Sequence, residues 1–405
     1  MAEPQKNNES PKIHKGLVGV YIDDSKISEI TQETSSLTYR GYAVQDLAEN
    51  CNFEEVAYLL WHGELPDAAQ LADFTKEERS LRALDDDLIA VLKTIRKDAH
   101  PMDVLRTAIS FIGTNDSEWD DETPEGELKK AVNLLAKMPT IIAAHARISQ
   151  GLDPIAPRDD LSYSENFLNM RFGAVPEPEV AKAFDVTMML YAEHSFNVST
   201  FTARTITSSL SDMYSAVTGA VGSLKGRLHG GANEAVMKML EEVGTPENAE
   251  SWLDDALKNK KVVMGFGHAV YKNGDSRVPT LKKHFNAVAK IKGGEKLVKM
   301  AEILEAKMLK DKNIRPNVDY PIGPLYHMMG FDKEEFTPMF AMARIVGWTS
   351  HVMEQRATNK LIRPLCTYSG EEERKVPPMD QRGEKTPVSK PAPAVQKQHG
   401  KTPKR

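Results

Sequence analysis

The sequence predicts an all-α fold, and three of its features lead to that prediction. Apolar residues recur at helical spacing over long stretches, as in residues 43–66 and 178–190. The stretch from Val186 to Gly226 is rich in small residues and nearly uncharged, as expected of helices buried on most sides in a large core. Alternating strand patterns are scarce, and only GLVGVYID at residues 16–23 looks extended.

The first helical stretch reads AVQDLAENCNFEEVAYLLWHGELP. Leu47, Val56 and Leu60 are among its apolar residues at helical spacing. Gly63 and Pro66 follow the last of them, and both residue types end helices. The sequence therefore predicts that helical structure ends before Gly63.

Two regions are predicted to lack regular structure. Residues 115–128 are acidic and contain few apolar anchors. Residues 383–405 are rich in Pro and Lys and cannot bury enough apolar surface to offset the entropy of ordering. We expect a disordered, solvated basic tail there, rather than a contact with an acidic partner.

Length and composition exclude several functional classes. A chain of 405 residues can bury a sizeable core and form two domains. A net charge of -6 gives no case for binding nucleic acid or a membrane. Two cysteines, Cys51 and Cys366, make no disulfide framework. The chain shows no signal-peptide pattern and no apolar run that could span a bilayer, so we expect a cytoplasmic protein.

The first cluster of chemically active residues is the motif LHGGANE. His229 and two glycines, Gly230 and Gly231, precede a predicted helix over residues 233–243. The positive end of a helix lowers the pKa of a nearby histidine, so His229 is expected to be a neutral hydrogen-bond donor. The glycines would let a ligand approach the backbone closely. A glycine-rich turn with an incidental histidine is the alternative.

The second cluster is VVMGFGHAVYKNGDSR, residues 262–277. It is too rich in glycine for a helix and suits a loop that faces a substrate, with His268 at its centre. Its spacing fits neither the dinucleotide fingerprint nor a phosphate-binding loop.

The third cluster is RPNVDYPIG, in which Asp319 lies among apolar and aromatic residues. Desolvation would raise the pKa of this carboxylate toward that of a useful general base. A helix-capping aspartate is the alternative.

The fourth cluster is FTPMFAMARIVGW, for which Thr337 is the predicted N-cap. Arg344 shares a helix face with Phe340 and Trp348, and a buried guanidinium needs an anionic partner. That partner is either a structural acid or a substrate carboxylate. Arg363 follows the same helix in the motif IRP.

Taken together and in this order, LHGGANE, GFGHAVY with DSR, PNVD, and ARIVGW with IRP resemble the citrate synthase family. The similarity runs from TYRGY at residue 38 to YSGEEER at residue 368. It implies a mostly α-helical homodimer. It also implies a large helical domain, residues 1–230 and 331–382, with an inserted smaller helical domain at residues 231–330.

The resemblance also implies roles for individual residues. Asp319 would remove a proton from the acyl α-carbon, His229 would hydrogen-bond the thioester oxygen, and His268 would protonate the oxaloacetate carbonyl. Oxaloacetate would be held by His194, Arg277, Arg344 and Arg363, the last reaching the active site of the partner subunit. Coenzyme A would lie against Val262, Val263, Met264, Gly265 and Phe266. No metal or other cofactor is implied, because the acyl-CoA is a substrate.

Within the family, the segments YAEHSFNVSTFTAR and EQRATNKLIRPLCTYSG look most like the 2-methylcitrate synthases, which use propionyl-CoA. A citrate synthase that uses acetyl-CoA is the first alternative, because one methylene changes binding by only about 1–3 kcal/mol. Ala269 departs from many relatives, which have Arg there. A metal hydrolase built on His194, His229 and His268, and a non-catalytic helical interaction protein, are the alternatives from other classes.

Overall fold

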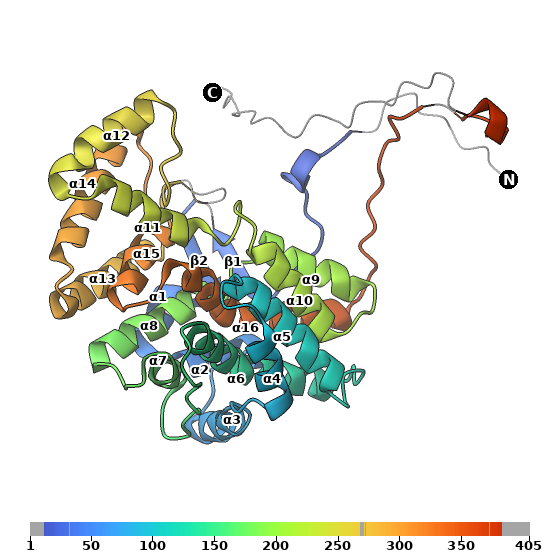
Figure 1. The fold of residues 1–405 in the computed structure, drawn as a ribbon, viewed down its shortest axis with the longest axis horizontal. Helices are drawn as coiled ribbons and strands as arrows, with labels where there is room; N and C mark the ends of the chain where they lie inside the picture. The colour runs from blue at the N-terminus through green and yellow to red at the C-terminus, as the bar shows by residue number, and fades with distance from the viewer. Residues whose placement is uncertain (1–11, 32, 268–270, 272, 372, 383–405) are drawn as a thin grey trace. The chain divides into compact units, whose positions relative to one another are not determined.

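The computed structural model describes residues 12–382, apart from residues 32, 268–270, 272 and 372. Residues 21–362 form one compact unit (Figure 1). The described parts of the two terminal segments, residues 12–20 and 363–382, form a second unit, in which the regular structure is limited to two 3₁₀ turns. Within the described residues, no helix is both long and apolar enough to cross a membrane.

The described part of the compact unit contains sixteen α-helices and one three-stranded antiparallel sheet, which confirms the all-α class. The α-helices are Val44–Asn50 (α1), Phe53–His62 (α2), Ala68–Ser80 (α3), Asp86–Thr94 (α4), Pro101–Asn115 (α5), Pro124–Ser149 (α6), Tyr163–Phe172 (α7), Pro178–Tyr191 (α8), Val198–Ser208 (α9), Met213–Leu224 (α10), Ala232–Val243 (α11), Ala249–Lys258 (α12), Val278–Lys292 (α13), Glu295–Lys312 (α14), Asp319–Met328 (α15) and Phe336–Ala357 (α16). The strands are Ser28–Thr31 (β1), Ser36–Tyr39 (β2) and Tyr42–Ala43 (β3), and the 3₁₀ turns are Lys15–Leu17 (η1), Pro246–Asn248 (η2), Lys333–Glu335 (η3) and Met379–Gln381 (η4).

Helix α16 is the central element of the compact unit. Every residue from Phe336 to Val352 is buried, as expected of a helix that is apolar on all sides. It packs on α2, α5, α6, α8, α9, α10 and α11. One central helix therefore reaches the parts of the chain that carry the polar motifs.

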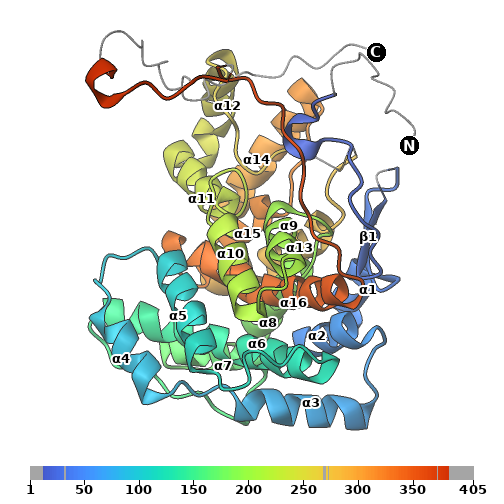
Figure 2. The ribbon, with the colours of Figure 1, turned by 90° about the vertical axis from the view of Figure 1, so that its right-hand side faces the viewer.

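Helices α11–α15 pack on one another and, through α13 and α11, on α8 and α16. Helix α15 packs on α11 and α13, and α14 packs on α12 and α13. In two views at right angles, α12 and α14 lie at the end of the unit opposite to α3 and α7 (Figures 1 and 2). The smaller domain predicted at residues 231–330 contains these five helices, and the division into two domains stays a prediction.

Several local expectations were wrong. Residues 16–23 form no strand, and the three short strands come later in the chain. The stretch 43–66 is two helices, because Asn52 caps a new one through a capping box with Glu55. The region 115–128 is irregular only up to Thr123, which caps α6. The fourth motif's helix begins at Phe336, one residue before the predicted cap.

Candidate active site

A cavity of about 660 Å³ lies where four of the polar segments meet. Its walls come from residues 194–198, the segment around His229, the start of α15 and helix α16. It brings together five of the predicted site residues: His194, His229, Arg277, Asp319 and Arg344. These residues are up to 150 positions apart in sequence, so only the fold could place them together.

His229 is held at the N-terminus of α9. The backbone N–H of Ser199 donates to its Nε2 across 3.2 Å, and the Ser199 hydroxyl lies 2.8 Å from the same nitrogen. Since Nε2 accepts, the ring proton belongs on Nδ1. Burial, with a smaller contribution from Arg344, lowers the pKa of His229 to about 4. The ring is thus neutral, as the sequence predicted, although burial rather than the start of α11 is the main cause.

One of the two glycines beside His229 has a packing role in addition to the predicted one, which stays a prediction. A Cβ on Gly230 would come within 2.5 Å of the Leu224 carbonyl oxygen, which accepts the Gly230 N–H. Close packing of the chain on itself therefore requires Gly230. A Cβ on Gly231 would meet nothing within 4 Å.

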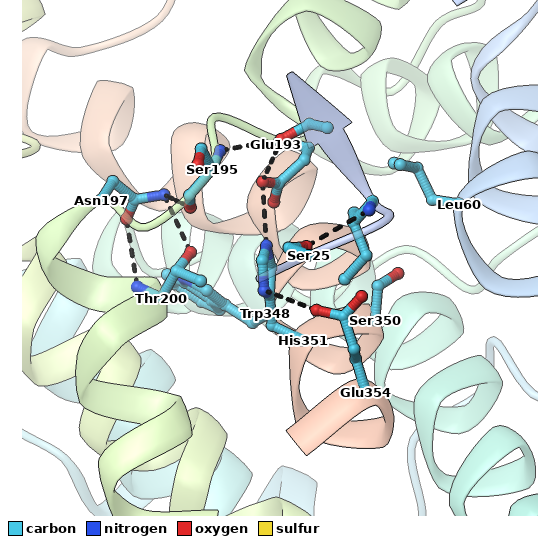
Figure 3. Close-up of polar contacts among 12 residues, drawn as sticks. Ser25, Leu60, Glu193, Ser195, Asn197, Thr200, Trp348, Ser350, His351 and Glu354 are labelled. Carbon is cyan, nitrogen blue, oxygen red and sulfur yellow. Dashed lines mark hydrogen bonds and ion pairs between the residues drawn. The ribbon is translucent and has the colours of Figure 1, made fainter. Parts of the chain in front are cut away.

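Helix α16 fixes the loop between α8 and α9 through hydrogen bonds (Figure 3). His351 bonds the Glu193 carboxylate at 3.0 Å, and the Trp348 indole N–H donates to Ser199 at 3.1 Å. Ser195 has a φ of 51°, a conformation that non-glycine residues rarely adopt. Asn197 caps α9 by accepting the Thr200 N–H. The loop that carries His194 is therefore held at both ends.

Asp319 is a half-buried residue at the first position of α15, and its carboxylate is desolvated. Burial raises its pKa to about 6, against the opposing effects of a hydrogen bond from Tyr191 and of Arg277. The predicted direction is therefore confirmed. Its own backbone N–H donates to the Asn317 side chain, so the carboxylate is not a helix cap. A carboxylate with a pKa near 6 is a stronger base than an exposed one and is still mostly ionised at neutral pH.

Arg344 and Arg277 differ in their partners. Arg344 donates from Nε to the Tyr191 carbonyl at 2.6 Å and lies over the Phe340 ring. Among the described residues, no carboxylate comes within 4.0 Å of its guanidinium, and burial lowers its pKa to about 10. Arg277 makes a two-point pair with Asp275 at 2.9 and 2.7 Å. Of the two arginines that line the cavity, Arg344 is thus the one without a structural acid at ion-pair distance among the described residues.

The segment 262–266 adjoins the cavity at Gly267. Gly265 has a φ of +80°, and a Cβ there would come within 2.8 Å of Val236 and Tyr320, so the position needs glycine. Gly265 also accepts the Asn317 N–H, and Asn317 donates to the Gly267 carbonyl. Val262 is exposed, and Phe266 packs on Tyr320. None of residues 262–266 lines the cavity itself.

Comparisons with known proteins identify the family. Residues 16–365 match the family described as "Citrate synthase, C-terminal domain". The chain belongs to the citrate synthase family. It is 55% identical to a citrate synthase of Mycolicibacterium smegmatis over 91% of this chain and 98% of that protein. It is 52% identical to a 2-methylcitrate synthase of Mycobacterium tuberculosis over 91% of this chain and 94% of that protein.

A solved structure supports the same assignment. The ternary complex of carboxymethyl coenzyme A and oxaloacetate with a citrate synthase from Thermoplasma acidophilum superimposes with a TM-score of 0.86 at 31% identity. The match covers 92% of this chain and all of that one. Enzymes of the citrate synthase family are acyltransferases whose CoA thioester is a substrate, so they need no further cofactor. The family rules out the metal-hydrolase and interaction-protein alternatives.

Two predicted site residues of this citrate synthase family member cannot be placed in the cavity. His268 lies outside the described residues. Arg363 belongs to the second unit, with the C-terminal segment, and its position relative to the cavity is not determined. The roles assigned to both remain predictions.

Three side chains of the motif YAEHSFNVS hold the predicted site residues in place, although the sequence predicted a role only for His194 in this motif. Tyr191 contacts Asp319, and Ser199 contacts His229. Glu193 and Ser199 connect the loop to His351 and Trp348 of α16. A run of polar residues inside an otherwise apolar region was the available signal, because buried polar groups need partners.

Proposed function

We propose that this enzyme condenses propionyl-CoA with oxaloacetate and water to give 2-methylcitrate and CoA, and that it also accepts acetyl-CoA. The observation that carries the condensation is the shared cavity of Asp319, whose pKa is about 6, and the neutral His229. Such a pair suits enolisation of a thioester, which needs a base at the α-carbon and a donor at the oxygen.

In the proposed reaction, Asp319 takes a proton from the α-carbon of the acyl group. The Nδ1–H of His229 donates to the thioester oxygen as negative charge develops there. The enolic carbon attacks the keto carbon of oxaloacetate, whose oxygen receives a proton from His268. Water then hydrolyses the thioester and releases CoA.

Oxaloacetate carries two carboxylates, and the proposed binding set is His194, Arg277, Arg344 and Arg363. Arg344 is the best supported member, because it faces the cavity without a structural carboxylate at ion-pair distance among the described residues. Arginine suits a carboxylate because it can donate two parallel hydrogen bonds. Residues 262–266 are proposed to contact CoA beside the cavity.

The preference for propionyl-CoA rests on local sequence. The segments around His194 and Arg363 resemble 2-methylcitrate synthases, and one such relative is 52% identical. A citrate synthase at 55% identity supports acetyl-CoA as the alternative substrate. A role in propionate catabolism follows only if propionyl-CoA is the better substrate.

A homodimer is also part of the proposal. The terminal unit exposes large apolar side chains, among them Leu365 and Tyr368 at 88% and 82% exposure. Exposed apolar patches often mark protein interfaces, and a second copy of the chain would cover them. The cytoplasmic location remains a prediction from the sequence.

Thiol release in the presence of oxaloacetate tests the proposed function. Purified protein is assayed with propionyl-CoA and with acetyl-CoA, and kcat/KM is compared. We expect both to release CoA, with the higher value for propionyl-CoA. A higher value for acetyl-CoA would assign a citrate synthase, and no oxaloacetate-dependent release from either would reject the condensation.

A further inference from the structure

Tyr191, the last residue of α8, makes a short hydrogen bond to the proposed base. Its hydroxyl donates to Oδ1 of Asp319 across 2.6 Å. The Asn233 side chain donates to the same hydroxyl oxygen at 3.4 Å, so the hydroxyl proton is directed at the carboxylate. Burial holds the pKa of Tyr191 far above its usual value, and the group stays protonated.

The ring of Tyr191 cannot swing away from Asp319. It stacks on Phe340 with centroids 3.8 Å apart and planes 17° from parallel. Its own carbonyl accepts from Arg344 at 2.6 Å. A fixed donor restricts rotation of the carboxylate that it bonds, because turning the carboxylate would break the bond.

The two carboxylate oxygens of Asp319 therefore differ in their hydrogen bonding. Oδ1 is occupied by Tyr191, whereas Oδ2 accepts no hydrogen bond from the described residues within 3.5 Å. Asp319 lines the cavity, so Oδ2 is the oxygen available to a substrate proton. Proton transfer is efficient only when the accepting atom is held at a defined position and direction.

We propose that Tyr191 is a positioning residue that directs Oδ2 of Asp319 toward the acyl α-carbon; this inference rests on the proposed role of Asp319 as the base. The bond also joins α8 of the large domain to α15 of the predicted smaller domain. A movement that separates these domains would break it and leave the base free to rotate. Tyr191 thus links the orientation of the base to the position of α15 relative to α8.

The bond also affects the acid strength of Asp319. Burial raises the pKa of the Asp319 carboxyl most, and the negative charge of Asp275 raises it further. The hydrogen bond from Tyr191 and the positive charges of Arg277 and Arg344 lower it. Tyr326 lies nearby as a further buried hydroxyl, bonded to Thr187. Removing the Tyr191 hydroxyl removes a contribution that favours the ionised form, so the pKa of Asp319 should rise.

The test is Tyr191→Phe, which removes the hydroxyl and keeps the ring. With propionyl-CoA and oxaloacetate we expect kcat to fall roughly tenfold to a hundredfold. The KM for oxaloacetate should stay within about twofold, since the carbonyl contact to Arg344 remains. The acidic limb of the kcat/KM profile should move to higher pH by about one unit.

A deuterium isotope effect reports on the step in which the α-proton is removed. With propionyl-CoA deuterated at the α-carbon, the deuterium effect on kcat should be larger in Tyr191→Phe, because a misplaced base makes proton removal more rate-limiting. The matched control is Tyr163→Phe, another fully buried tyrosine, whose hydroxyl donates to the Leu135 carbonyl. It should leave the pH profile and isotope effect unchanged.

The outcomes separate this inference from the proposed function. If Asp319→Asn remains active, Asp319 is not the base and both ideas fail. If Asp319→Asn is inactive while Tyr191→Phe keeps the wild-type kcat, pH limb and isotope effect, only the positioning role fails. If Tyr191→Phe weakened only the binding of oxaloacetate, the positioning role would also be overturned. Should Tyr191→Phe not fold, 3-fluorotyrosine at position 191 gives a stronger donor, and the acidic limb must then move to lower pH.

Discussion

His351 donates from Nε2 to the carboxylate of Glu193 across 3.0 Å, and both side chains are completely buried. Arg204 donates to the other ring nitrogen at 3.1 Å, which fixes this tautomer. The bond ties the centre of α16 to the residue before His194. The position of a predicted substrate ligand thus depends on a polar pair that itself lies outside the cavity.

Replacing one member of this pair should destabilise the protein strongly. His351→Ala leaves the Glu193 carboxylate buried without its main partner, and we expect the free energy of unfolding to fall by about 3–5 kcal/mol. Urea unfolding measures the change. The double variant His351→Leu with Glu193→Met should lose less than His351→Ala alone, and an equal or greater loss would show that packing rather than charge dominates.

Asp319→Asn should nearly abolish turnover while oxaloacetate still binds. Loss of a general base costs roughly 10²–10⁴ in rate. The arginines proposed to bind oxaloacetate are unaffected by this change. Thiol release and calorimetric titration with oxaloacetate measure the two properties, and turnover within tenfold of wild type would remove Asp319 from its role.

The same substitution should stabilise the protein at neutral pH. The folded-state pKa of Asp319 is about 6 against a usual 3.8, so the folded state holds a proton that the unfolded state has lost between these pH values. Stability therefore falls as pH rises from about 4 to 6, by about 3 kcal/mol in all. Asp319→Asn avoids this cost. Its melting temperature should exceed that of wild type at pH 7.5 and match it near pH 3.5.

Mixing two inactive variants tests whether Arg363 acts across a dimer. In a heterodimer of Asp319→Ala and Arg363→Ala, one site carries both defects and the other has its own Asp319 and the partner's intact arginine. Random exchange makes about half of the dimers mixed, so activity should recover to roughly a quarter of wild type. No recovery after verified exchange would place Arg363 in its own subunit's site or outside both.

Removing residues 383–405 should leave activity and stability unchanged. These residues lie outside the described part of the chain, and their composition gives no basis for a core. A chain ending at Arg382 should match the full chain in thiol release and in sedimentation. A truncated protein with a different mass or a lower kcat would assign a structural role to the tail.

The sequence by itself determined the fold class and the family, and it named the residues that are proposed to react. The buried face of a helix can be recognised in the sequence because its apolar residues recur at a regular spacing along the chain. The end of α2 could also be predicted, since Gly63, with a φ of 90°, follows its last residue. Motifs such as LHGGANE and PNVD are local, so His229 and Asp319 could be named without coordinates. The apolar surroundings of Asp319 even indicated the direction of its pKa.

The tertiary structure alone decided which atoms face one another. The bond from Tyr191 to Asp319 joins residues 128 positions apart, and the bond from Glu193 to His351 joins residues 158 positions apart. Periodicity and spacing describe one element at a time and contain no information on such pairs. The cause of the His229 pKa was misjudged for the same reason. Burial depends on how distant helices pack around the ring, and no local sequence pattern records that.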